Sequence, residues 1–190
     1  MAAVSFATWS GAVACVSAIT IGLVVVSGDV PAAEPIGWGG KADVTFAARL
    51  WKRLEADRLV GPKRINSGVL KGRPPHGLQQ VLASMAAVDG RSGRVIVKMS
   101  YEAPENLTQD QVWNAPDRTL AAYTVMFMRE AGYDPPHRNW FWVKYTPDGK
   151  VGLDNGRAVA GRVGLPSDAT TCIGCHVSKG GKDLEVFTPQ

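Results

Sequence analysis

The chain has 190 residues, 45% of them hydrophobic and 20% charged, which suits one globular domain with a hydrophobic core. Its net charge of +4 at pH 7 and pI near 9.1 raise the question of nucleic-acid binding. Lys and Arg are scattered and form no cluster, however, so we interpret them as solvated surface and exclude a nucleic-acid partner. The positive balance also suits an acidic protein partner.

The first 32 residues indicate a leader. Residues 2–28 carry no charged side chain, and residues 11–26 are almost wholly apolar. We favour a cleaved signal peptide over residues 1–32, because small residues at Pro31-Ala32-Ala33 follow the apolar stretch. An N-terminal membrane anchor is the alternative, since a spanning helix needs about 20 apolar residues. Either way we expect the folded part to be exported, to the periplasm of a bacterium, and Cys15 of the leader to have no function.

Residues 33–63 are expected to form a linker and a first helix. Asp43 is a candidate N-cap for a helix over residues 43–59, which Gly61-Pro62 ends. Its apolar residues recur at helical spacing: Val44, Ala47, Ala48, Trp51 and Leu54. A weak strand is predicted over residues 64–70.

A second helix is predicted after this strand, ending before the turn signal Asp89-Gly90. One apolar stripe supports it: Leu78, Val81, Leu82 and Met85. β-branched residues then predict a strand over residues 94–101. Alternation along a strand puts two sets of side chains on opposite faces, Val95, Val97 and Met99 against Ile96 and Lys98.

The remaining elements complete the fold class. A capping box of Thr108 and Gln111 predicts a short helix over residues 108–113. Strands are expected over residues 120–129 and 139–146, and Pro147-Asp148-Gly149 turns the second into a hairpin with residues 150–153. The glycine-rich residues 156–164 lead to a last helix, with Ser167 or Asp168 as its cap. Residues 64–190 therefore predict an α+β domain dominated by an antiparallel sheet with flanking helices.

This last helix carries the string Cys172-Ile173-Gly174-Cys175-His176, a C-x-x-C-H attachment signal for one c-type haem. Residues three apart lie on one face of a helical turn, so both thiols can reach the vinyl groups of a single porphyrin. The histidine that follows then falls under the ring, where its imidazole can ligate the iron.

Other uses of this motif fit less well. A redox C-x-x-C is expected in a βαβ context, which the sequence does not indicate. A zinc site needs a fourth ligand, whereas Cys15 lies in the leader and His76 and His137 stand alone.

Several segments together resemble the cytochrome P-460 family, which includes the cytochromes c′-beta. In chain order they are RVIVKMSY (residues 94–101), TVM (124–126), GYDP (132–135), NWFWVKYTPDG (139–149), the haem motif (172–176) and DLEVFT (183–188). The resemblance covers about residues 65–188. The haem motif is common to many cytochromes, and the aromatic W-F-W-V-K-Y-x-P-D-G run is much more specific.

The resemblance implies a sheet-dominated homodimer in which each subunit holds one five-coordinate haem with an open distal side. In the cytochromes P-460 proper, a lysine is also bonded to the porphyrin edge and the enzyme oxidises hydroxylamine; the matching position here is Lys98. The c′-beta members lack this bond and bind nitric oxide or carbon monoxide in an apolar pocket. The hydroxylamine oxidisers also place a carboxylate near the distal side, for which Asp168 and Glu102 are candidates without a clear match.

Three functions therefore stay open. The first is oxidation of hydroxylamine or a related nitrogen oxide, with Cys172, Cys175 and His176 holding the haem, Lys98 modifying it, and an exported protein accepting electrons. The second is binding of a small gas without catalysis, against an apolar wall from the strand at residues 120–129. The third is simple electron transfer, which needs a sixth axial ligand. By residue type the candidates for that ligand are His76, His137, Met85, Met99, Met126 and Met128.

Overall fold

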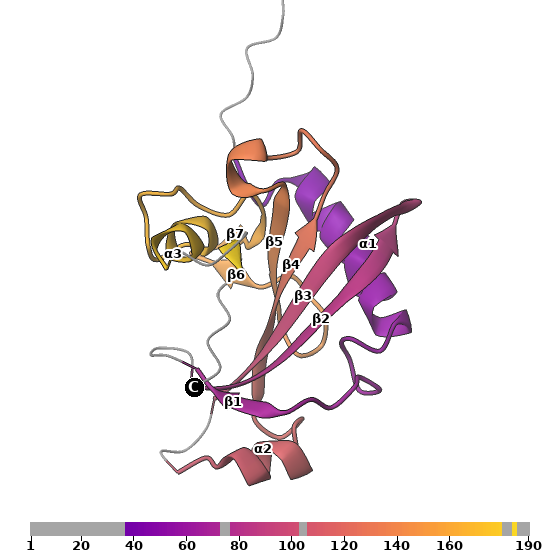
Figure 1. Ribbon diagram of the computed structural model, residues 1–190, viewed down its shortest axis with the longest axis vertical. Helices are drawn as coiled ribbons and strands as arrows, with labels where there is room; N and C mark the ends of the chain where they lie inside the picture. The colour runs from indigo at the N-terminus through magenta and orange to yellow at the C-terminus, as the bar shows by residue number, and fades with distance from the viewer. Residues whose placement is uncertain (1–36, 73–76, 103–105, 180–183, 186–190) are drawn as a thin grey trace, which may run out of the picture. The chain divides into compact units, whose positions relative to one another are not determined.

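The computed structural model describes residues 37–72, 77–102, 106–179 and 184–185 (Figure 1). The leader over residues 1–32 and His76 lie outside these ranges. No helix in the described part of the chain is long and apolar enough to cross a membrane.

An antiparallel sheet forms the centre of the described fold, which agrees with the predicted α+β class. Its six strands lie in the order β1-β2-β3-β4-β5-β8. Their bounds are Val69–Lys71, Leu78–Val88, Arg91–Tyr101, Leu120–Met128, Trp140–Tyr145 and Ala160–Gly161. β6 (Leu153–Asp154) and β7 (Arg157–Ala158) form a separate two-stranded pair.

The two faces of the sheet bury different side chains. On the first face, β3, β4 and β5 contribute a large cluster that includes Val97, Val125 and Val143, which lie opposite one another in the strand register. The second face carries a smaller cluster around Ile96, Met126 and Trp142, again a cross-strand row. The alternation predicted for residues 94–101 is therefore confirmed, and Lys98 shares the second face with Ile96.

Helix α1 (Lys41–Ala56) covers the first face. Its buried side chains pack on the sheet, and Phe46 meets the ring of Phe141 edge-on with centroids 4.8 Å apart. The Tyr145 hydroxyl donates to the Ala47 carbonyl over 2.7 Å, which satisfies a buried phenol. Helix α3 (Cys172–Ser178) lies on the opposite side of the sheet from α1 (Figure 1).

The prediction of a second helix before Asp89 is wrong. Leu78–Val88 form strand β2, which pairs with β3 from Leu78↔Tyr101 to Val88↔Arg91. Its apolar residues have helical spacing, but Asp89 and Gly90, with φ of 53° and 77°, form a two-residue turn that brings the chain straight back. The pairing along all of β3 satisfies the backbone of β2, so the tertiary context overrides the local pattern. In this strand Met85 is 59% exposed and does not join a helical core face.

Two predicted caps also need correction. Gly40 is the N-cap of α1, and Asp43 lies one turn further in, where its carboxylate accepts from the Gly40 backbone N–H over 3.3 Å. Thr171, and not Ser167 or Asp168, caps α3. An Asp or Thr near a helix start can satisfy the exposed N–H groups from more than one position, so composition alone does not choose between them.

Other boundaries agree more closely. Helix α2 (Gln109–Asn114) begins after Thr108 with the predicted capping box. The strands predicted over 120–129 and 139–146 are β4 and β5. The strand predicted over 64–70 is reduced to β1 at its end, and the hairpin after Gly149 is held by a single bridge between Tyr145 and Val151.

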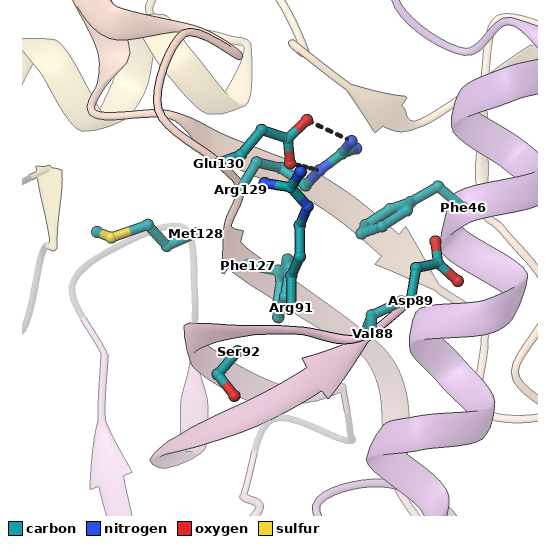
Figure 2. A pocket seen from close by; sticks show the side chains of 9 residues that line it. All are labelled: Phe46, Val88, Asp89, Arg91, Ser92, Phe127, Met128, Arg129 and Glu130. Carbon is teal, nitrogen blue, oxygen red and sulfur yellow. Dashed lines mark hydrogen bonds and ion pairs between the residues drawn. The ribbon is translucent and has the colours of Figure 1, made fainter.

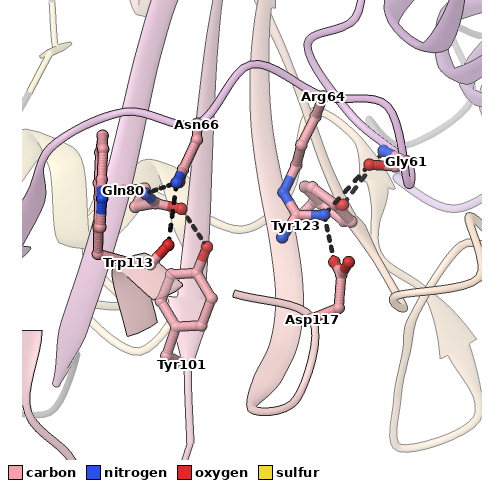
Figure 3. A network of polar contacts seen from close by, with 8 residues as sticks. All are labelled: Gly61, Arg64, Asn66, Gln80, Tyr101, Trp113, Asp117 and Tyr123. Atoms are coloured by element: carbon pink, nitrogen blue, oxygen red, sulfur yellow. Dashed lines mark hydrogen bonds and ion pairs between the residues drawn. The ribbon is translucent and has the colours of Figure 1, made fainter. Parts of the chain in front are cut away.

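A buried polar network closes the end of the first face near β1 and α2 (Figure 3). Arg64, whose side chain is 5% exposed, donates to the Gly61 carbonyl and the Asp117 carboxylate. Gln80 is fully buried and binds the Tyr101 hydroxyl and Asn66. Both groups lie on the face opposite to Lys98, so this network contributes to folding and not to the site described below.

Replacing Leu50 by alanine tests the packing of α1 on the sheet. Leu50 is fully buried, so Leu50→Ala should lower the free energy of unfolding by about 2–5 kcal/mol, measured by chemical denaturation. Leu153→Ala is the matched control, because Leu153 is 67% exposed and its truncation should change stability by less than about 0.5 kcal/mol. Equal effects of the two changes would contradict this arrangement.

Candidate functional site

The C-x-x-C-H motif forms the short helix α3, which is fixed at its start by Thr171. The Thr171 hydroxyl accepts from the Gly174 backbone N–H over 3.3 Å and donates to the Asp168 carbonyl over 2.7 Å. The backbone N–H of Ile173 donates to the Val163 carbonyl over 3.1 Å, which joins the helix to the segment after β8. Cys172 and Cys175 are therefore one turn apart on an anchored helix, and both are free thiols.

Gly174 lets the preceding loop approach α3 closely. A Cβ atom at this position would lie 1.9 Å from the Asp168 carbonyl oxygen and 2.6 Å from that of Leu165. The loop backbone has to move before any larger residue fits. Packing against the loop therefore restricts the size of the residue at Gly174, the second variable position of the motif.

Ile173 joins α3 to the sheet. It is 1% exposed and belongs to the cluster on the second face with Ile96, Met126 and Trp142. Cys172 packs at the margin of this cluster. The helix that carries the motif therefore lies on the sheet face that also carries Lys98.

His176 is oriented by two contacts. Its Nδ1 forms a hydrogen bond with the carbonyl oxygen of Leu184, and its ring meets Trp142 edge-on with centroids 4.7 Å apart. A carbonyl only accepts, so Nδ1 donates the proton in this bond, which in the neutral ring leaves the lone pair on Nε2. This is the tautomer that a metal-ligating histidine needs, with the second nitrogen bonded to a carbonyl.

Lys98 lies near both cysteines. In the strand register it is directly opposite Thr124, which is opposite Lys144, so these three side chains form one row across the second face. Burial lowers the pKa of Lys98 below its ordinary value, and the thiols of Cys175 and then Cys172 act in the opposite direction. Among the described residues no carboxylate contributes to this shift, and the cross-strand neighbours of Lys98 are Val81 and Thr124.

The Cys172 thiol is held in its protonated form. Burial raises its pKa to about 11, and the positive charges of Lys98 and Lys144 only partly oppose this. A thiol in such a place is a poor thiolate nucleophile at neutral pH, which argues against thiol–disulfide exchange.

Sequence reasoning did not find Trp142, Leu184 or Glu185 as parts of this site. The indole N–H of Trp142 is fully buried and has no hydrogen-bond partner among the described residues. An unsatisfied N–H in such a position costs free energy, so it indicates an acceptor beyond the described residues. The aromatic W-F-W run was a signal for Trp142, but its alternation was not used to assign that residue to the side of α3.

The other candidates from the sequence fall elsewhere. Asp168 is exposed and accepts from the backbone and hydroxyl of Thr170, and Glu102 is exposed beyond β3. Met99 is buried on the first face, which excludes it as a ligand on the side of α3. His137 pairs with Asp134 at 2.9 Å in the loop before β5. Met126 lies in the cluster with Ile173, and Met128 packs against it.

Two further findings limit the chemistry. Within the described ranges, no group of three or more His, Cys, Asp and Glu side chains is arranged to hold a metal ion. A separate hollow of about 370 Å³ lies between the start of α1, the β2–β3 turn and the end of β4, lined by residues such as Phe46, Arg91 and Arg129 (Figure 2). Arg129 is held there by Glu130 at 3.0 Å. None of Lys98, Cys172, Cys175 or His176 lines this hollow.

No protein-family model, curated protein or solved structure matches this chain. The resemblance to the cytochrome P-460 family therefore stays a prediction that its sequence motifs support.

Replacing Gly174 by alanine tests the close packing of α3 against its loop. The added methyl group meets two backbone carbonyls, so Gly174→Ala should lower the free energy of unfolding by about 1–3 kcal/mol. Val177→Ala, in the same helix at a side chain that is 38% exposed, is the control and should have a much smaller effect. The measurement is chemical denaturation of both variants. A Gly174→Ala protein as stable as the parent would contradict the geometry.

Proposed function

We propose that this chain is an exported monohaem c-type cytochrome of the P-460 type, which binds and oxidises hydroxylamine or a related nitrogen oxide. The observation that carries the proposal is the juxtaposition of Lys98 with Cys172 and Cys175 on one apolar face of the sheet. The sequence motifs that resemble the family support it independently. A homodimer and an exported redox partner belong to the same proposal.

The residues present fit a covalently bound haem. Cys172 and Cys175 are free thiols one helical turn apart, in reach of a single porphyrin. His176 has the tautomer with a lone pair on Nε2, as iron ligation requires. The unpartnered indole N–H of Trp142 supplies a donor beside that histidine. Haem c is the cofactor that uses all of these groups together.

Each side chain has a distinct role in this proposal. Cys172 and Cys175 attach the cofactor through thioether bonds, and His176 is its proximal metal ligand. A haem held there would supply an iron able to take up a nitrogen-oxide substrate and to accept electrons from it. The apolar cluster around Ile96 and Met126 keeps water from one side of the site.

Lys98 distinguishes an enzyme from a plain cytochrome. Its lowered pKa leaves more of the amine neutral than in a surface lysine, and the neutral form carries the lone pair that a bond to a ring carbon uses. That bond would replace one N–H and one ring C–H bond and would need a two-electron oxidant such as a peroxide. A second covalent attachment would change the electronics of the ring, which is one of the protein's levers on haem chemistry.

A gas-binding role of the cytochrome c′-beta type is the second candidate. It is favoured by the apolar cluster and by the finding that neither Asp168 nor Glu102 contacts Lys98 among the described residues. An apolar distal side binds neutral gases and offers no proton relay. Simple electron transfer needs a sixth axial ligand, for which Met126 and Met128 are the methionine candidates on the sheet face that carries α3.

Replacing Lys98 by alanine separates the first two candidates. If Lys98 is bonded to the ring, the parent protein should show a broad ferrous absorption band at longer wavelength than an ordinary c-type haem. Lys98→Ala should then restore the ordinary spectrum. Lys52→Ala is the matched control, an exposed lysine of α1 on the other side of the sheet, and should leave the spectrum unchanged.

The same proteins are then assayed for hydroxylamine-dependent reduction of an artificial electron acceptor. The proposal expects turnover by the parent and by Lys52→Ala, and at least a tenfold loss in Lys98→Ala. An ordinary parent spectrum, tight nitric oxide binding and no turnover would overturn the enzyme and favour gas binding. A low-spin six-coordinate iron in the resting protein would favour electron transfer.

A further inference from the structure

Two consecutive residues after α3 contact two different parts of the site. The carbonyl oxygen of Leu184 accepts the hydrogen bond from His176 Nδ1. The carboxylate of Glu185 is bound by the guanidinium of Arg94 through two hydrogen bonds of 2.7 and 2.8 Å. Glu185 is 13% exposed and Arg94 is 45% exposed, so the carboxylate is largely shielded from water. Arg94 thus connects β3 to the segment that orients His176.

This pair has the geometry of a strong interaction. Isolated surface ion pairs contribute little to stability, but a bidentate Arg–carboxylate pair fixes both partners in one plane. The neighbouring Leu184 has a φ of 64°, a left-handed conformation that a leucine adopts only when its surroundings hold it there. The two hydrogen bonds from Arg94 to Glu185 can hold this backbone, and with it the direction of the Leu184 carbonyl.

The direction of that carbonyl has a chemical consequence at His176. A hydrogen bond accepted from Nδ1 makes the imidazole a more basic ligand through Nε2. A more basic axial ligand donates more charge to iron and stabilises its oxidised form. Any movement of Leu184 therefore changes the bond between His176 and a metal bound at Nε2.

We propose that Arg94 is a positioning residue that tunes the haem iron, by holding Glu185 and thereby the Leu184 carbonyl against His176. This inference rests on the proposed haem-binding function. Arg94 lies on β3 four residues before Lys98 and on the same face, since residues two and four apart share one side of a strand.

The test compares the purified holoprotein with Arg94→Gln and Glu185→Gln, both of which remove the charged fork. Haem content is measured first, by mass and by the spectrum of the pyridine complex. The iron–histidine stretching frequency of the ferrous form is then measured by resonance Raman spectroscopy, and the reduction potential by titration. Both variants should show a lower stretching frequency and a three- to tenfold shift of the redox equilibrium toward ferrous protein.

Two further variants make the result specific. Arg49→Gln breaks the exposed pair with Asp89 at 2.9 Å on the other side of the sheet, and should leave frequency and potential as in the parent. The double change Arg94→Glu with Glu185→Arg restores an ion pair with reversed charges and should recover most of the parent frequency.

The outcomes separate this inference from the function on which it rests. A parent protein without covalent haem overturns both. A parent with haem, together with Arg94→Gln and Glu185→Gln proteins of parent frequency and potential, overturns the role of Arg94 alone. Loss of stability in these variants at unchanged frequency means that the pair is only structural, and it also overturns the inference.

Discussion

The site depends on the register of strand β3. This strand pairs with β2 on one side and β4 on the other, so its backbone is fixed along its whole length. Side chains of a strand alternate between the faces, and a shift by one residue would turn Lys98 into the core under α1 and expose Val97. Burial of Val95, Val97 and Met99 on the first face prevents that shift. The core under α1 thus determines what faces α3.

On the second face, the chain buries polar side chains that water would otherwise solvate. Burial disfavours the charge of Lys98, the nearby Cys175 and Cys172 partly oppose this, and burial also keeps the Cys172 thiol protonated. Trp142 adds a buried indole N–H without a partner among the described residues. Such groups carry a free-energy cost in a folded protein unless a ligand satisfies them. A haem attached to α3 is the ligand that we propose, and its propionate and ring-edge positions offer acceptors and reactive carbons.

Much of the fold could be predicted from local patterns. The strand over residues 94–101 shows alternation, and Thr108 with Gln111 forms a capping box in which both partners lie within one turn. The β2 segment could not be predicted in this way, because its apolar spacing suits a helix and its strand state depends on pairing with β3. The Asp89-Gly90 pair predicts a turn from the sequence, but it predicts a β-hairpin only when the segments on both sides of it are strands.

The residues of the candidate site also differ in whether a local pattern predicts their position. Cys172, Cys175 and His176 belong to one short motif, so their proximity needs only a helical turn. Lys98 was singled out by resemblance and alternation, and its nearness to the thiols depends on α3 folding onto the second face. The contacts of His176 with Leu184 and Trp142 join distant parts of the chain and have no local signature.

We propose that a single haem binds between α3 and β3, the strand that carries Lys98. Peptide mapping of the purified protein by mass spectrometry is the decisive test. We predict that the peptide containing Cys172, Cys175 and His176 carries the mass of one haem, and that the same haem joins it to the peptide containing Lys98. Unmodified thiols at Cys172 and Cys175 would contradict the account.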